Sequence, residues 1–311
     1  MPEPSSPRQY RLALVLMLVA AGLGSTSFTV GKAIADTIDP VILTLVRFCL
    51  ATLFFYPYVQ KKHGLKRPSL SSLGRYSMVS FALTAFFVLM FVALRYTSAI
   101  NTGVIFTLVP GISGIYSIVL LHERLGRNRL IALFLAMLGA IWVIFRGDPS
   151  QMPALQFNQG DLIFFGACLL MGLYTPLVKL LYRGEPMPVM TFWILATSCG
   201  WLALAAAPRI PATNWSDIAW STWAGILYLA IFCTLITFFL SQWSTIRLGP
   251  TRVMAYSYLY PPLILLMDWA LGHPLPPIRT LPGIVLIGLT MVIVQHNADK
   301  STGKKRPLKN S

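Results

Sequence analysis

Residues 76–95 read YSMVSFALTAFFVLMFVALR, with no charged side chain before the final Arg95. About 20 mostly apolar residues in a helix cross the hydrocarbon core of a bilayer, so this stretch predicts a membrane-spanning helix. Its apolar residues run on without alternating with polar ones, which favours a helix over a strand of a membrane barrel. The stretch therefore indicates that the chain lies in a membrane.

Nine further stretches are similarly apolar and nearly free of charge. The ten predicted spans are 12–34, 40–59, 76–95, 99–121, 130–146, 161–182, 189–207, 222–245, 253–271 and 281–296. The connections between them are too short to hold a soluble domain. The predicted fold class is therefore an all-α integral membrane protein with ten transmembrane helices.

The composition agrees with this fold class. Hydrophobic residues make up 56% of the 311 positions, charged residues only 11%, and the mean hydropathy is +0.67. A soluble domain carries charge on about a quarter of its residues, so this chain could not cover a water-exposed surface. The net charge of +15 does not predict binding to nucleic acid, because the basic residues lie in short loops and tails. They predict orientation in the membrane and contact with anionic lipid.

The lysines and arginines predict the orientation of the chain. With the N-terminus in the cytoplasm, 18 of the 25 basic residues fall in cytoplasmic segments. Three more lie within predicted spans, and the four that remain for the outside are Arg95, Arg146, Arg209 and Arg279. By the positive-inside rule, both termini are predicted to be cytoplasmic.

The chain contains a weak internal repeat. Residues 93–110 (ALRYTSAINTGVIFTLVP) and 244–261 (STIRLGPTRVMAYSYLYP) each place a short turn between two spans and then a proline. Ten spans with both ends inside divide into two sets of five with opposite orientation, and such inverted repeats are typical of secondary transporters. The predicted organisation is an N-terminal segment 1–11, a first repeat 12–146, an extracytoplasmic linker 147–160, a second repeat 161–296 and a basic tail 297–311.

An ordered set of residues resembles the drug/metabolite transporter (DMT) superfamily, in its EamA-type ten-helix branch. The matching features of the two halves are Lys32, Asp39-Pro40, Arg47, residues 93–99, Pro110 and Glu123, then Lys179, Leu248-Gly249-Pro250, Pro261 and Leu271-Gly272. One departure is His273, where the family usually has a glutamate. The resemblance implies a bacterial inner-membrane protein that exports a small metabolite, often an amino acid.

Four charged residues lie within predicted spans: Lys32, Arg47, Lys179 and Asp268. Such groups cost several kcal/mol when they face lipid, so they usually face a cavity or a partner. The two lysines lie near span ends, where they could instead extend to the interface. Arg47 lies deeper, and we hypothesise that it pairs with Asp268 or receives the carboxylate of a substrate.

Other polar and aromatic residues are candidates for the substrate pathway. They are Tyr96, Asn101, Thr107, Pro110, Tyr174, Thr237, Ser241, Trp243, Tyr256 and Tyr260. Hydroxyl groups in membranes also form bonds between helices, and aromatic residues near helix ends also anchor at the interface. Both alternatives remain open for these positions.

The sequence predicts a secondary transporter that works by alternating access, with an amino acid as substrate and protons as the candidate coupling ion. Nucleosides, amines and drug-like cations are alternative substrates. A membrane-embedded enzyme is disfavoured, because the chain has no GxSxG or HExxH motif, and without a Walker A loop no ATP hydrolysis is predicted. A receptor is disfavoured by the division into two inverted halves.

No cofactor and no metal site is predicted, because the four cysteines lie in apolar runs without metal-ligand spacing. The small residues Ala132, Ala136, Gly139 and Ala140 predict close helix packing, with dimerisation as the alternative. We expect a monomer or a weak homodimer.

Overall fold

The computed structural model describes residues 7–34, 37–93, 95–97, 102, 105–123, 125–148, 150, 158–270 and 277–296. Within these ranges the structure is helical and contains no strand. The α-helices are α1 (Pro7–Ile34), α2 (Pro40–His63), α3 (Leu70–Ala93), α5 (Val109–Leu121), α6 (Arg127–Ile144), α7 (Gln159–Leu181), α8 (Met187–Ala206), α9 (Trp220–Ala230), α10 (Thr237–Leu248), α11 (Pro250–Ala255), α12 (Tyr260–Ala270) and α13 (Leu281–His296). Short 3-10 or π turns are η2 (Trp215–Asp217), η3 (Ile231–Ile236), η4 (Tyr256–Leu259) and η5 (Ile278–Thr280).

Seven of the described helical segments are long and apolar enough to cross a membrane. They are Arg8–Gly31, Pro40–His63, Leu70–Ala93, Arg127–Ile144, Gln159–Leu181, Met187–Ala206 and Trp220–Leu248. Val109–Leu121 and Ile278–Val294 are shorter apolar helices. These findings confirm an all-helical protein suited to a membrane. The layout of ten spans in two inverted halves stays a prediction.

Local sequence explains where several helices begin. The Asp39 side chain accepts hydrogen bonds from the backbone N–H groups of Val41 and Ile42, and Pro40 follows it at the first helical position of α2. Asn158 and Asp161 form a capping box at the start of α7. These caps satisfy N–H groups that have no partner within a helix.

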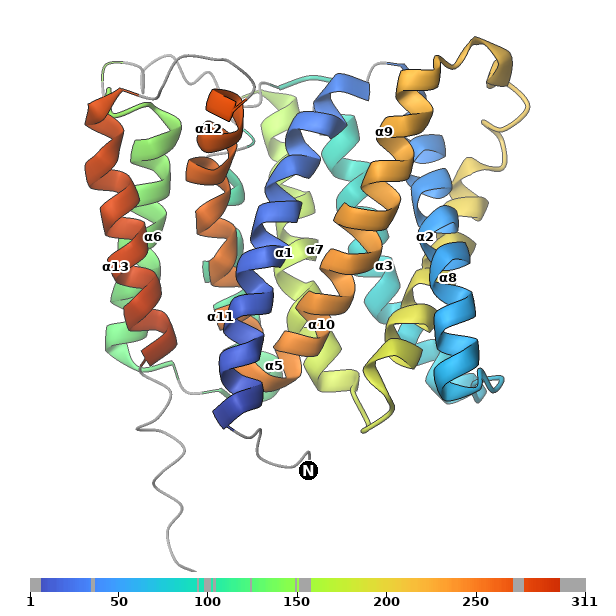
Figure 1. Ribbon diagram of the computed structural model, residues 1–311, viewed down its shortest axis with the longest axis horizontal. Coiled ribbons are helices and arrows are strands. Elements are labelled where there is room, and N and C mark those ends of the chain that lie inside the picture. The colour runs from blue at the N-terminus through green and yellow to red at the C-terminus, as the bar shows by residue number, and fades with distance from the viewer. Residues whose placement is uncertain are drawn as a thin grey trace, which may run out of the picture.

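The helices form one bundle, in which α6 and α13 lie side by side at one end (Figure 1). The contact between α6 and α13 depends on two glycines. A Cβ atom added at Gly139 would lie 2.9 Å from the carbonyl oxygen of Gly283, and one added at Gly283 would lie 2.8 Å from that of Gly139. Ala132, Ala136 and Ala140 are buried as well. The stripe of small residues therefore serves close helix packing, as its composition predicts.

The span from α9 to α10 is interrupted by the π-helical turn η3. Two hydroxyl groups bond to carbonyl groups five residues earlier: Thr234 to Leu229 at 2.9 Å, and Thr237 to Phe232 at 2.8 Å. A π turn inserts one residue into a helix, and such turns occur frequently at functional sites. The sequence analysis does not predict this turn.

Candidate functional site

A cavity lies between α1, α2, α3, α7, α10 and the segment from α11 to α12. Most of its wall is apolar. The apolar lining includes Met17, Phe86, Phe87, Met90, Phe106, Met171, Phe238 and Met254. Ser27, Arg47, Tyr174, Thr237, Ser241, Tyr256, Ser257 and Tyr260 contribute the polar groups. An apolar pocket with a few converging polar groups is the usual form of a small-molecule site.

Six of the candidate residues from the sequence analysis meet at this cavity. They are Arg47, Tyr174, Thr237, Ser241, Tyr256 and Tyr260. Arg47 comes from α2 and Tyr174 from α7, while the others come from the stretch between α10 and α12. The fold therefore brings together residues from both predicted repeats.

Arg47 is the charged residue of the described cavity lining, and only 1% of its surface is exposed. Its Nε atom donates a hydrogen bond to Oγ1 of Thr234, and its Nη2 atom donates to the carbonyl oxygen of Cys233 at 3.1 Å. The guanidinium carbon lies 4.6 Å from the centroid of the Phe87 ring, which is a cation–π distance. Cys233 and Thr234 both belong to η3, so the π turn presents the groups that hold Arg47.

No carboxylate among the described side chains forms an ion pair with Arg47. The side chain of Asp268, the partner that we hypothesise for it, lies outside the described part of the structure, as does that of Lys32. Asn101 lies outside the described residues altogether. The hydrogen bonds to η3 thus compensate part of the cost of burying this cation.

A buried polar network supports Tyr174. The hydroxyl of Thr191 donates to Oε1 of Gln242 at 2.7 Å, and Nε2 of Gln242 donates to the hydroxyl of Tyr174 at 2.9 Å. The Tyr174 hydroxyl accepts this bond, and Tyr174 lines the cavity. Gln242 is fully buried and was not among the candidates; a buried amide in an apolar span is the signal that could have identified it.

Aromatic packing positions Tyr260 in the cavity wall. The rings of Tyr260 and Phe106 stack with centroids 5.8 Å apart and an interplanar angle of 13°. A Cβ atom added at Gly24 of α1 would lie 2.7 Å from the Tyr260 hydroxyl oxygen, so the glycine makes room for this ring. The Tyr256 hydroxyl donates to the carbonyl oxygen of Leu14 at 3.2 Å. Both tyrosines therefore join the α11–α12 segment to its neighbours.

The other described candidates lie away from the cavity. Tyr96 is 61% exposed in the turn after α3, and Pro110 is buried in the first turn of α5. Thr107 lines a different, lateral groove. The guanidinium of Arg247 packs over the ring of Trp243, with its carbon 3.5 Å from the ring centroid.

Lys179 forms an ion pair with Glu123, with 2.6 Å between Nζ and Oε1. In the sequence analysis, Glu123 lies between the predicted spans 99–121 and 130–146 and Lys179 near a span end, and no contact between them is predicted. The pair joins the end of α7 to the loop after α5. It thus links the two predicted repeats.

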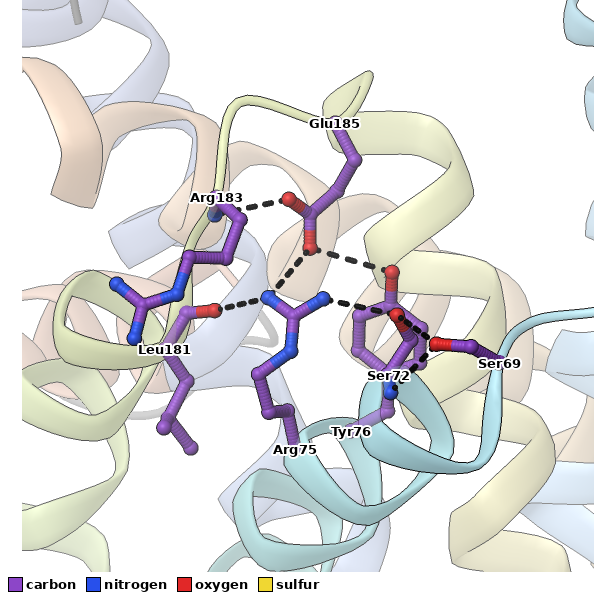
Figure 2. A network of polar contacts seen from close by, with 7 residues as sticks. All are labelled: Ser69, Ser72, Arg75, Tyr76, Leu181, Arg183 and Glu185. Atoms are coloured by element: carbon purple, nitrogen blue, oxygen red, sulfur yellow. Dashed lines mark hydrogen bonds and ion pairs between the residues drawn. The ribbon is translucent and has the colours of Figure 1, made fainter. Parts of the chain in front are cut away.

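A second cross-repeat network joins the start of α3 to the loop between α7 and α8 (Figure 2). Nη1 of Arg75 donates to the carbonyl oxygen of Leu181 at 2.7 Å and lies 3.6 Å from Oε1 of Glu185. The Tyr76 hydroxyl donates to the same carboxylate oxygen at 3.2 Å. On the predicted topology, this network and the Lys179–Glu123 pair both lie at the cytoplasmic end.

Contacts also join the repeats at the opposite end of the bundle. Nε of Arg209 lies 3.8 Å from Oδ2 of Asp39, and the Thr97 hydroxyl donates to Oδ1 of Asp161. The cavity therefore lies between two sets of polar contacts, each of which spans both predicted repeats.

Residues 11–145 and 158–295 each match the EamA-like transporter family. The uncharacterized transporter YyaM of Bacillus subtilis is 22% identical over 285 residues, which is 89% of this chain and 92% of that protein. An uncharacterized transporter of Archaeoglobus fulgidus is 25% identical over 258 residues, 82% of this chain and 86% of its own. A solved crystal structure shares the fold, with a TM-score of 0.73 at 18% identity over 94% of this chain and 99% of that one.

Proposed function

Because the chain belongs to the EamA-like transporter family, we propose that it is a secondary transporter of an amino acid with a bulky apolar or aromatic side chain. The family and the related proteins are membrane transporters and not enzymes, as the sequence analysis predicts. The substrate, the direction of export and the alternating-access mechanism are our proposals. So are the bacterial inner membrane and the cytoplasmic position of both termini.

One observation carries the proposal: among the described residues that line the cavity, the buried Arg47 is the one cation, and the other walls are mostly apolar. A guanidinium group has five N–H donors, and the described contacts of Arg47 use one each from Nε and Nη2. The remaining donors suit the planar carboxylate of an amino acid. A substrate carboxylate would also neutralise the buried charge of Arg47.

The apolar part of the cavity suits the body of such a substrate. Phe86, Phe87, Phe106 and Phe238 give aromatic surface near the cation, and the methionines give adaptable surface. The polar groups of Thr237 and Ser241 could receive the substrate ammonium group. Amines and drug-like cations fit less well, because Arg47 would repel them.

Alternating access agrees with the duplication of the family match and with the placement of the polar contacts. The matches cover 11–145 and 158–295, which correspond to the two predicted repeats. In the proposed cycle, the Lys179–Glu123 and Arg75–Glu185 contacts break when the cavity opens at that end. The Arg209–Asp39 and Thr97–Asp161 contacts break when it opens at the other. Protons are the proposed coupling ion.

The test is uptake of labelled compounds into proteoliposomes that contain the purified protein, with and without a pH gradient. We expect uptake of phenylalanine, tryptophan or leucine and not of the amines that lack their carboxylate. A pH gradient should accelerate uptake if protons are coupled. Transport of the decarboxylated amines at equal rates would contradict the proposed role of Arg47.

A further inference from the structure

A lateral groove lies behind the cavity, between α5, α6 and α7, with about 890 Å³ of empty volume including its open side. Its lining is almost wholly apolar. Ile115 on α5 and Phe134 on α6 are 63% and 55% exposed, so large apolar side chains border an open space. In a protein that spans a membrane, this space opens toward the lipid.

One end of the groove carries positive charge. Arg127, Leu130 and Phe134 follow one another at i, i+3 and i+7, so they share one face of α6. Leu130 and Phe134 line the groove, which places Arg127 at its end.

The start of α6 lacks the groups that would balance this charge. Gly126 gives no side-chain cap, and the first turn contains no acidic residue. The free N–H groups of the first turn add a positive partial charge to that of Arg127. The nearby acid Glu123 is already paired with Lys179. A phosphate group is the kind of anion that stabilises such a helix start.

We propose that the groove binds one anionic phospholipid, with an acyl chain between α5 and α6 and its phosphate at Arg127 and the start of α6. The apolar groove and the positive charge at its end favour the same ligand, because a phospholipid joins an apolar chain to an anionic group. Gly111 lines the groove and leaves space in it, since a Cβ atom added there would have no neighbour within 4 Å. The proposal does not depend on the transported substrate.

The bound lipid would support the wall of the cavity. Tyr258 of η4 lines the groove, whereas its neighbours Tyr256 and Ser257 line the cavity. Likewise, Phe106 faces the cavity and Leu108 faces the groove. The lipid and the substrate thus contact opposite sides of the same two short segments.

The proposal can be tested by native mass spectrometry of the purified full-length protein. Phosphatidylglycerol and phosphatidylcholine with identical acyl chains are added at equal concentration. We expect one retained phosphatidylglycerol, preferred over phosphatidylcholine by about fivefold, which corresponds to the roughly 1 kcal/mol that one basic residue contributes near an anionic lipid. The variant Arg127→Gln should lose that preference. Gly111→Leu, which puts a larger side chain where an added Cβ atom meets nothing within 4 Å, should lower the retention of both lipids.

A matched control is Arg8→Gln/Arg11→Gln, which removes two exposed arginines at the start of α1. This variant should keep the preference for phosphatidylglycerol. Equal retention of the two lipids by the unchanged protein would overturn the proposal, and so would an equal loss of preference in the control. If the unchanged protein is a dimer and the Gly111→Leu variant is a monomer, a second copy of the chain covers the groove in place of a lipid, and the proposal is overturned. Size-exclusion profiles confirm that each variant is folded.

Discussion

Gly24 offers a sharp test of whether the central cavity is the substrate pathway. A Cβ atom at this position would lie 2.7 Å from the Tyr260 hydroxyl oxygen, whereas ordinary contact begins near 3.4 Å. In Gly24→Ala, the Tyr260 ring must therefore move by about 0.7 Å, the difference between these distances. A displacement of about 1 Å in a binding site can cost up to 100-fold in rate, so we expect transport to fall roughly tenfold.

Gly22→Ala is the matched control, because it changes the same residue type two positions earlier on α1. A Cβ atom there meets nothing within 4 Å. Alanine is favoured over glycine in a helix interior by about 1 kcal/mol, so this variant should be slightly more stable and transport normally. Proteoliposome uptake gives transport, and thermal unfolding in detergent gives stability. If both variants transport at the same rate, Tyr260 does not border the pathway.

Three further predictions follow from the contacts of single residues. Arg47→Ala should abolish transport while membrane insertion stays intact, and Arg47→Lys should rescue poorly because an ammonium group makes no planar bidentate contact; near-normal uptake by Arg47→Ala would refute the assigned role. Glu123→Gln should change the free energy of unfolding by less than about 1 kcal/mol, because the Lys179–Glu123 pair is partly exposed, but it should alter the transport rate. Exchanging Glu123 and Lys179 should restore part of that rate, and no recovery would count against a gating contact. Gly139→Ala should lower the free energy of unfolding by about 1–3 kcal/mol through overpacking against α13, whereas Gly166→Ala, which meets open space, should not; equal unfolding midpoints would contradict the close contact.

The sequence predicts an all-helical membrane protein, because each membrane span must bury its backbone polar groups within itself and so leaves a long apolar run. Arg47 is also predictable, since a charge deep in such a run needs a polar environment. The sequence does not separate the cavity residues Tyr174, Thr237 and Tyr256 from Tyr96 and Trp243, which lie away from the cavity. Their residue types do not distinguish the cavity from the ends of the bundle.

Other parts of the site depend on contacts between residues far apart in the chain. Arg75 meets Glu185, and Lys179 meets Glu123, only after the helices have packed. In the sequence, Glu185 and Glu123 cannot be distinguished from other acidic residues in loops. The groups that hold Arg47 come from the π turn, and apolar periodicity does not reveal an extra residue within a continuous apolar span.

The extra residue in η3 has a consequence for comparing this chain with its relatives. Each residue of an α-helix advances by about 100° around the axis, so one inserted residue rotates everything beyond it by that angle relative to everything before it. A relative with the same residues at positions 237 and 241 but a regular helix before them would direct those side chains elsewhere. Identical residues could then serve different substrates, and deleting one residue from 231–236 would be expected to turn the hydroxyl groups of Thr237 and Ser241 away from the cavity.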